Sequence, residues 1–417
     1  MTSTPPFYSF VIPTRDRHDV LGPAIQTILA QTRDNFELVV MDNYSTPETR
    51  QVVDAFASPR IRYVRAPERL SMLDNWEFAL DHVKGDYVHY LGDDDGMFPD
   101  SVEIATHLHG QYPGLSLTWQ SVHYFWPDCI IPSHRGLGQM RVGRVVEIRD
   151  SRWALGEAYS GRLHQADLPT IVFSFVPRSV IEQARKKYGR YFWFRAPDVS
   201  SAIVNAINSE FYLYSYRPLG INGASKHSNG ASHMYAHIND EAYKKWLADA
   251  KIASTDKPLD DRLDGGFITE VGIVDELFWL QNKFKPEIGD IPVEMRDFLK
   301  WIVQAAPRYF ARFDEVVAAV ETMARRNGVD MRDIPIPAKV PPAEKQDFTF
   351  GTDDRTGTVS YSYYTNTNHV RTVADFAEEA GRHCVPVSQL LIQDRRPEAA
   401  TKRTPTLGTR LRSFLGR

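Results

Sequence analysis

Strand and helix patterns alternate along the first hundred residues, and this alternation limits the fold more than any other feature of the sequence. Short β-rich segments occur at 8–14, 36–42, 60–66 and 86–92. Segments with apolar residues at helical spacing lie between them, at 19–32, 46–57 and 71–85. Strands that alternate with helices of this length form a parallel sheet with helices on both faces. We therefore expect an α/β fold.

Polar residues follow three of these strands at the point where each one ends. They are Thr14, Arg15 and Asp16 after the first strand, Asp42 and Asn43 after the second, and Asp93, Asp94 and Asp95 after the fourth. Ligands of parallel sheets bind beyond the carboxyl ends of the strands, so we expect these groups to meet in one crevice. Three adjacent carboxylates repel one another, and either water on an ordinary loop or a bound cation offsets that repulsion. Their position at a strand end favours the cation.

Two common phosphate-binding motifs do not occur in the chain. No G-x-G-x-x-G follows the first strand, and no G-x-x-x-x-G-K-[ST] is present. A phosphate ligand therefore needs another source of positive charge. Carboxylates that hold Mg²⁺ or Mn²⁺ supply it, because these hard cations bind oxygen atoms and bridge to diphosphate oxygens. The aspartate triplet thus predicts a divalent cation together with a diphosphate.

Composition excludes several other classes of protein. A net charge of −4 gives no reason to expect nucleic acid as the main partner. The two cysteines, Cys129 and Cys384, suit neither a disulfide scaffold nor a thiolate metal site. The first residues show no basic region followed by an apolar core, and no run of eighteen apolar residues occurs. These features predict a cytoplasmic protein.

The segment from residue 7 to about residue 110 carries a set of motifs in a fixed order. They read FVIPTRDR, IQTILAQT, FELVVMDNYSTPET and NWEFALDHVKGDYVHYLGDDDGMFPDS. This set resembles the donor-binding half of family 2 glycosyltransferases with the GT-A fold, and a weaker resemblance continues to about residue 230. The resemblance implies a Rossmann-like parallel or mixed sheet flanked by helices. It also implies a nucleotide-diphosphate sugar donor, a divalent cation and inversion at the anomeric carbon.

The resemblance assigns roles to the acidic residues by their position in the motifs. Gly92 stands where the family has its first acidic residue, so Asp94 and Asp95 are expected to hold Mn²⁺ or Mg²⁺ and Asp93 to contact the donor. The family often ends its second strand in two aspartates, the second of which reads a uracil N–H. Here the pair is Asp42-Asn43, and an amide offers both donors and an acceptor, so the base is not restricted to uracil.

Further donor-side residues follow from the same resemblance. Pro13, Thr14 and Arg15 match the loop that packs beside the base. Asn75 matches a polar helix position facing the donor, although a solvated helix residue fits the sequence equally well. His227, in SKHSNG, matches a histidine that completes the metal site in some relatives. Its alternative interpretation is a surface loop of small polar residues.

An inverting transfer also needs a carboxylate that takes the proton of the acceptor hydroxyl. Asp198, in YFWFRAPDVSSAIVNAI, follows aromatic residues and opens a short helical pattern. By its chemistry alone it is also a natural N-cap of that helix. The resemblance favours catalysis, since the family has its base after an aromatic-rich segment at the start of such a helix. The two roles are compatible.

The sequence predicts a catalytic domain followed by several appended regions. They are a GT-A domain at 1–235 (donor half 1–110, acceptor half 111–235), a helical extension at 236–335, a linker at 336–345, a small α+β region at 346–394 with a C-terminal β-hairpin and helix, and a basic tail at 395–417. The extension has amphipathic patterns at 240–252, 269–284 and 294–326. They offer a surface for self-association or acceptor binding, or they simply pack on the catalytic domain. The tail is either disordered or a peripheral contact with an anionic membrane surface.

The sequence therefore predicts a metal-dependent inverting glycosyltransferase with a glycan or lipid-linked glycan acceptor, in bacterial surface polysaccharide synthesis. A sugar nucleotidyltransferase shares the sheet architecture but has a glycine-rich G-x-G-x-R loop after the first strand, which PTRDR does not match. A non-catalytic nucleotide-sugar-binding scaffold is the other alternative. The missing first carboxylate of the acidic motif gives that alternative some weight.

Overall fold

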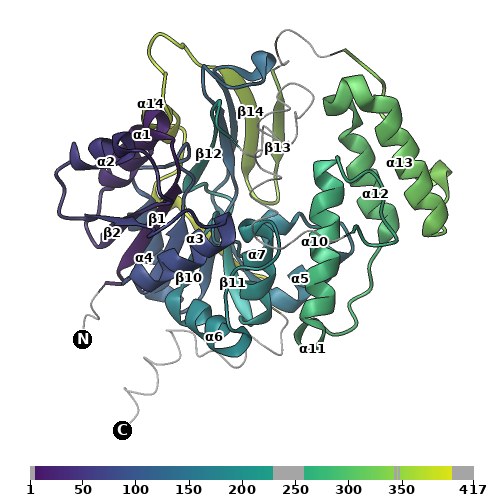
Figure 1. The fold of residues 1–417 in the computed structure, drawn as a ribbon, viewed down its shortest axis with the longest axis horizontal. Helices are drawn as coiled ribbons and strands as arrows, with labels where there is room; N and C mark the ends of the chain where they lie inside the picture. The colour runs from purple at the N-terminus through teal and green to yellow at the C-terminus, as the bar shows by residue number, and fades with distance from the viewer. Residues whose placement is uncertain (1–4, 229–257, 342–344, 346–347, 397–417) are drawn as a thin grey trace.

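The structure is a computed structural model that describes residues 5–228, 258–341, 345 and 348–396 (Figure 1). Two of the predicted features, the helix at 240–252 and most of the basic tail, lie outside these residues. Among the described residues, no helix combines the length and the apolar content that a membrane span requires.

A mixed nine-stranded sheet forms the centre of the described part of the chain, in the order β15-β9-β11-β6-β10-β4-β1-β2-β3. The predicted strands are present as β1 (Tyr8–Thr14), β2 (Phe36–Asp42), β3 (Ile61–Arg65) and β4 (Tyr87–Tyr90), all parallel. The others are β6 (Ser116–Trp119), β9 (Val145–Asp150), β10 (Ser174–Pro177), β11 (Phe211–Ser215) and β15 (Leu391–Asp394). The α/β expectation is confirmed, and β10 makes the sheet mixed because it runs antiparallel to both β4 and β6.

Helices cover both faces of this sheet, as the alternation of patterns predicts. They are α1 (His18–Leu29), α2 (Pro47–Asp54), α3 (Met72–Ala79), α4 (Ser101–Gln111), α5 (Ser151–Tyr159), α6 (Arg178–Tyr188) and α7 (Pro197–Ile207). Side chains alternate across a strand. Phe10 and Ile12 of β1 accordingly join one buried cluster with residues of α1 and α4, while Val11 joins the opposite cluster with residues of α7.

A second, six-stranded sheet has the order β13-β14-β8-β7-β12-β5. Its strands are β5 (Gly96–Met97), β7 (Val122–Phe125), β8 (Leu137–Val142), β12 (Gly220–Ala224), β13 (Phe350–Asp353) and β14 (Thr358–Tyr364). The predicted C-terminal hairpin and helix are both present, the helix being α14 (Val373–Gly381). β14 pairs with β8 and β15 pairs with β9, so residues 350–394 are built into both sheets.

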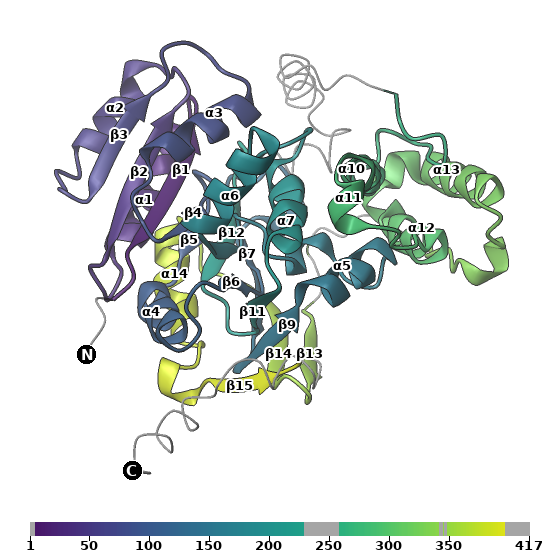
Figure 2. The ribbon, with the colours of Figure 1, turned by 90° about the horizontal axis from the view of Figure 1, so that it is seen from below.

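The helical extension packs beside the central sheet (Figure 2). It contains α10 (Thr269–Lys283), α11 (Lys285–Ile288), α12 (Met295–Gln304), a 3₁₀ segment (Ala306–Arg312) and α13 (Phe313–Arg326). The pattern at 294–326 is therefore interrupted, and Pro307 stands at the break because proline cannot continue an α-helix. One buried cluster runs from Val11 of β1 through α7 into α10, α12 and α13. The extension thus shares its core with the sheet.

Candidate active site

The loops after β1 and β2 are tied to each other at the carboxyl end of the sheet. The backbone N–H of Asp16 donates to Ser45 Oγ at 2.9 Å, and the N–H of Thr46 donates to Asp16 Oδ1 at 2.9 Å. Asp16 and Tyr44 have φ values of 55° and 61°, a region that residues other than glycine rarely adopt. These paired contacts hold both unusual conformations in place, as is common at functional sites.

Asp42 and Asn43, which the sequence predicts to read the base, use their side chains to fix these loops. Asp42 is fully buried and accepts hydrogen bonds from Tyr63 Oη at 2.5 Å and from the N–H of Ser45 at 2.9 Å. The amide of Asn43 bonds both backbone groups of Leu70, donating to its carbonyl and accepting from its N–H at 2.9 Å each. Both side chains are therefore buried and hold the backbone of these loops in this structure.

Asp93 lies at the end of β4 and contacts the loop after β1. Its carboxylate accepts from Thr14 Oγ1 at 2.8 Å and from Arg17 Nη1 at 3.0 Å. The prediction that strand-end groups from β1 and β4 meet is confirmed by these contacts. Sequence reasoning missed Arg17, although its place in TRDR, three residues after the strand end, was a signal. The guanidinium offsets part of the negative charge of the triplet, and Asp93 and Asp94 raise its pKa against the effect of burial.

Strand β12 lies directly against Asp94 and Asp95. Asp94 Oδ2 accepts from both the N–H and the hydroxyl of Ser225, at 3.1 Å and 2.7 Å. Asp95 Oδ1 accepts from the N–H of Gly223 at 2.7 Å. A Cβ at Gly223 would lie 1.8 Å from the carbonyl oxygen of Asp94, so only glycine permits this approach. The acidic triplet is therefore held by a strand that begins some 125 residues later, which the sequence analysis did not foresee.

Glycine at position 92 has a steric reason. Asp95 Oδ2 accepts from the backbone N–H of Gly92 at 2.9 Å, and a Cβ there would lie 2.6 Å from the same oxygen. The carboxylate of Asp95 therefore occupies the space beside the position where the resembling family has its first acidic residue. A side chain at position 92 would displace Asp95.

The electrostatics of the triplet favour a bound cation. Burial and the neighbouring Asp93 carboxylate raise the pKa of Asp94, while Arg17 and Ser225 oppose this shift. Burial and the charge of Asp94 raise the pKa of Asp95 to about 8. No hydrogen bond to Asp94 Oδ1 occurs among the described residues, and a carboxylate oxygen is the ligand that Mg²⁺ and Mn²⁺ prefer. The donor set therefore fits a hard cation, for which Asp94 Oδ1 would be the available protein ligand.

His227 contacts a different carboxylate. Its Nε2 lies 2.9 Å from Asp19 at the start of α1, and Lys226 Nζ lies 2.8 Å from the same side chain. Among the described residues, no group of three His, Cys, Asp or Glu side chains has the geometry of a metal site. His227 lies two residues after Ser225, which donates to Asp94, but its own imidazole contacts Asp19. His233 and His237 lie outside the described residues.

Three further donor-side candidates lie near the strand ends. Pro13 and Arg15 are half-buried on either side of Thr14, at the end of β1. Asn75 is in α3, is 2 % exposed, and its Oδ1 has no hydrogen-bond partner among the described residues. A buried acceptor without a partner is costly unless a ligand or water satisfies it. The solvated-helix interpretation of Asn75 is therefore wrong.

Asp198 lies in the first turn of α7 but does not cap that helix. The N-cap is Ala196, Pro197 follows it, and the side chain of Asp198 is exposed to solvent. The surrounding protein raises the pKa of its carboxyl by desolvation, while the N–H groups of Asp198 and Val199 oppose the shift. An exposed carboxylate with a raised pKa suits a proton acceptor. The capping interpretation is wrong, because proline at the first helical position displaces Asp198 by two residues.

A short connection joins the turn of Asp198 to the acidic triplet. The hydroxyl of Thr170 donates to the carbonyl oxygen of Asp198 at 2.8 Å, and the next residue, Ile171, accepts from the N–H of Tyr90 at 3.1 Å. Tyr90 ends β4, three residues before the triplet begins. The two groups of candidate residues thus belong to one end of the sheet.

The comparisons with known proteins agree with this arrangement. The family model described as Glycosyl transferase family 2 matches residues 9–119. Residues 9–119 are thus a glycosyltransferase family 2 segment. The segment that carries the match includes β1 to β4, the loops that follow them and the aspartate triplet.

Several curated relatives match about a quarter of this chain. A PGL/p-HBAD biosynthesis glycosyltransferase of Mycobacterium bovis is 31% identical over 121 residues, 28% of this chain and 47% of that protein. The putative teichuronic acid biosynthesis glycosyltransferase TuaG of Bacillus subtilis is 27% identical over 25% of this chain and 42% of its own length. The putative colanic acid biosynthesis glycosyl transferase WcaA of Escherichia coli is 28% identical over 24% and 36%. The chain spans less than half the length of each.

Among solved structures, that of S. aureus TarS 1–349 in complex with UDP-GlcNAc is similar over 78% of this chain and 92% of that chain. The TM-score is 0.43 and the sequence identity is 13%.

Proposed function

We propose that this chain is an inverting, metal-dependent glycosyltransferase that moves a sugar from a nucleotide-diphosphate sugar to a glycan or glycoconjugate acceptor. The match of residues 9–119 to glycosyltransferase family 2 supports the donor class. Relatives named for teichuronic acid and colanic acid biosynthesis support a role in bacterial surface polysaccharide synthesis. The expected acceptor is a glycan, free or linked to a lipid.

The observation that carries this proposal is the pairing of two carboxylate groups at one end of the sheet. The triplet at the end of β4 supplies a cation ligand in Asp94, and the connection through Thr170 and Ile171 brings in the exposed carboxylate of Asp198. A displacement at an anomeric carbon needs both a stabilised diphosphate leaving group and a proton acceptor for the incoming hydroxyl. The triplet would serve the leaving diphosphate, and Asp198 would accept the proton.

The residues of this chain divide the reaction between them. Asp94, and Asp95 beside it, would hold Mn²⁺ or Mg²⁺, which when bound neutralises charge on the leaving diphosphate. Asp93, fixed by Thr14 and Arg17, would orient the donor next to that position. Asp198 would take the proton of the acceptor hydroxyl as its oxygen attacks the anomeric carbon. The raised pKa of Asp198 makes it a better base than an ordinary surface carboxylate.

The nucleotide is proposed to lie over the loops after β1 and β2. Pro13 and Arg15 flank this position, and the unpartnered Oδ1 of Asn75 is available to a donor hydroxyl. Asp42 and Asn43 support base binding indirectly, since their side chains hold the shape of the loops. His227 is proposed to approach the cation only after its contact with Asp19 has opened.

A panel of nucleotide sugars, incubated with and without Mn²⁺, tests the proposed function. A glycosyltransferase releases nucleoside diphosphate from one or more of them, and chelation with EDTA suppresses that release. A sugar nucleotidyltransferase would instead exchange pyrophosphate into the nucleotide sugar. Binding of a nucleotide sugar without either reaction, in the presence of candidate glycan acceptors, would favour a non-catalytic scaffold. Release of nucleoside diphosphate that EDTA leaves unchanged would contradict the metal dependence.

A further inference from the structure

The turn that leads into α7 contains a residue in an unfavourable backbone conformation. Phe194 has a φ of 59°, which is uncommon for a residue with a bulky side chain. Such a conformation is costly and persists only where the surrounding structure enforces it. Four residues later the chain reaches Asp198, the proposed base. The conformation of this turn therefore decides where that carboxylate lies.

An aromatic residue of the helical extension packs against the strained position. The ring of Trp279, in α10, stacks on the ring of Phe194 with centroids 5.0 Å apart and planes 15° apart. On the same turn, Lys283 of α10 lies 4.4 Å from the centroid of the Trp193 ring. Both contacts come from α10, whose sequence position is some 80 residues beyond the turn.

A carboxylate of α10 completes the start of α7. Both oxygens of Glu276 accept from the backbone N–H of Ala196, at 3.3 Å and 3.2 Å. Ala196 is the N-cap residue of α7, and its own side chain has no polar atom to cap the helix. In an ordinary capping box the residue three positions into the helix returns a carboxylate to the N-cap N–H. Val199 occupies that position here, and Glu276 makes the contact from another helix.

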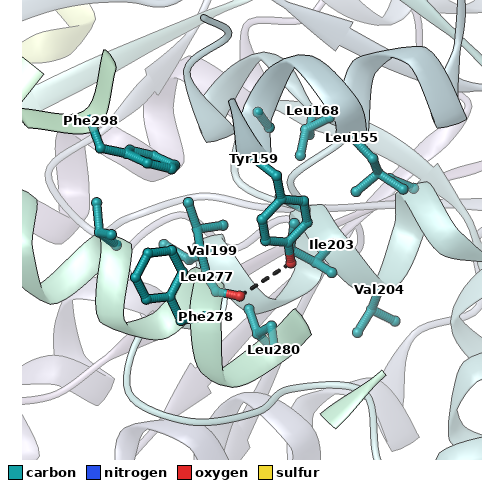
Figure 3. Packing of buried hydrophobic residues seen from close by; sticks show 14 of the residues in the cluster. Leu155, Tyr159, Leu168, Val199, Ile203, Val204, Leu277, Phe278, Leu280 and Phe298 are labelled. Atoms are coloured by element: carbon teal, nitrogen blue, oxygen red, sulfur yellow. Dashed lines mark hydrogen bonds between the residues drawn. The ribbon is translucent and has the colours of Figure 1, made fainter. Parts of the chain in front are cut away.

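The two helices are fixed in their relative position by apolar packing. Figure 3 shows Val199 and Ile203 of α7 facing Leu277 and Leu280 of α10 within one buried cluster. Tyr159, at the end of α5, donates through its hydroxyl to the carbonyl oxygen of Leu277 at 3.2 Å. Movement of α10 along α7 would break this contact as well as the contact of Glu276 with Ala196.

The charges around Glu276 explain how a carboxyl can be buried there. Glu276 is 3 % exposed, and burial together with the carboxylate of Asp198 raises its pKa well above the usual value. Asp275 adds to this shift, while Arg195 and the N–H of Ala196 oppose it. A raised pKa favours the protonated, neutral form of a buried carboxyl, which is the form that costs least to bury.

We propose that Glu276 is a positioning residue for Asp198, acting with Trp279 to hold the turn 194–197 in the conformation that aims the proposed base at the acceptor. The inference rests on the proposed function. It assigns the helical extension to the catalytic apparatus rather than to assembly. A purely structural role for the same contacts would affect the stability of the protein and leave the rate of the chemical step unchanged in the folded state.

Three variants separate the two roles. Glu276→Ala removes the contact with Ala196, while Glu276→Gln keeps an oxygen acceptor of nearly the same shape and is neutral. Glu270→Ala is the matched control, because Glu270 is equally buried in α10 but pairs with Arg308. Each variant is compared with the wild type for thermal stability, for binding of nucleoside diphosphate with Mn²⁺, and for release of nucleoside diphosphate from the donor identified by the nucleotide-sugar panel.

A positioning role predicts a specific pattern. Glu276→Ala should lower kcat by about tenfold or more, since displacement of a reacting group by about 1 Å is enough for such a loss. Its nucleotide affinity should be unchanged, because the nucleotide is proposed to lie over the loops after β1 and β2 and not at this turn. Glu276→Gln should retain most of the activity, and Glu270→Ala should lose stability without losing kcat. The acid limb of the kcat profile should move to lower pH in Glu276→Ala only, because water entering the vacated space lowers the pKa of Asp198.

Two results would overturn the inference while the proposed function stands. One is an active wild type whose Glu276→Ala variant keeps its kcat and its pH profile. The other is a Glu276→Gln variant as slow as Glu276→Ala, because the hydrogen bond to Ala196 is retained in the former. A wild type that releases no nucleoside diphosphate from any donor would contradict the proposed function itself.

Discussion

The contact between Thr14 and Asp93 and the contact between Ala196 and Glu276 span almost the same length of chain, 79 and 80 residues. The first was foreseeable and the second was not. Thr14 and Asp93 follow neighbouring parallel strands, whose carboxyl ends meet at one edge of a sheet wherever they occur in the sequence. Ala196 and Glu276 meet because two helices pack, and no comparable rule fixes which residues of two helices face each other. Separation in sequence is thus a poor guide to what can be predicted.

The largest effect is expected at the proposed base, on the side of the molecule that helix packing organises. Asp198→Asn should lower turnover by about 10²-fold or more, the usual scale for loss of a general base. Nucleotide binding should be unchanged. Because Asp198 is not the cap of α7, the free energy of unfolding should change by less than about 1 kcal/mol in both Asp198→Asn and Asp198→Ala. Kinetic assays and thermal unfolding check both expectations.

Glu210→Gln is a suitable control for this experiment, since Glu210 is an exposed carboxylate just beyond the other end of α7. A fully active Asp198→Asn enzyme would contradict the catalytic assignment. The residues at the carboxyl ends of the parallel strands would then be the remaining candidates for function.

The second largest effect is expected at the strand ends. Asp94→Asn should weaken Mn²⁺-dependent binding of nucleoside diphosphate by about tenfold or more, as loss of even an outer partner of a metal site does. The fold should survive, because the carboxylate lies at the end of a strand rather than in the apolar core. Calorimetric titration with and without Mn²⁺ measures the effect, and the exposed Asp290→Asn variant is the control. Unchanged Mn²⁺-dependent binding would remove Asp94 from the site.

A smaller effect is expected where strand β12 supports the triplet. Ser225→Ala removes the hydroxyl that donates to Asp94 Oδ2 at 2.7 Å but leaves the backbone donor of the same residue. The affinity for Mn²⁺ with nucleotide should fall by roughly tenfold at most. The fall should be larger at low pH, since loss of a donor to the ionised form raises the pKa of Asp94 further. Ser121→Ala, which touches His123 instead, should bind as the wild type does.

The smallest functional effect is expected at Asn43, where substitution should leave the preference among nucleotides unchanged. Because its amide bonds both backbone groups of Leu70, Asn43→Ala should loosen one loop and cost about 1–3 kcal/mol in stability. The substitution should weaken the binding of UDP, GDP and TDP by the same factor. A changed ranking among these three nucleotides would restore Asn43 as a direct reader of the base, as the sequence alone predicts.

The regions of this protein differ in how much of them the sequence predicts. β1 and β2 have the predicted bounds, since a strand buried on both faces reads as a continuous apolar run with polar ends. The strands between residues 116 and 224 are short and pair out of sequence order, as when β12 joins β7 and β5, and they were not predicted. Their partners depend on long-range packing. The C-terminal hairpin was predicted as a unit, but its pairing with β8 was not.

The sequence by itself determined the alternating α/β half, the meeting of Thr14 with Asp93, and the candidacy of Asp94 and Asp198. The first two follow from local periodicity and from the geometry that every parallel sheet shares, and the candidacy of Asp94 and Asp198 follows from the resemblance to family 2 glycosyltransferases. Only the tertiary structure decided that Asp95 fills the space beside Gly92, that the amide of Asn43 hydrogen-bonds to the backbone of Leu70, and that α10 supports the turn of Asp198. The reason is physical: hydrogen bonds between side chains and distant backbone depend on how helices and strands pack, and packing is a property of the whole chain.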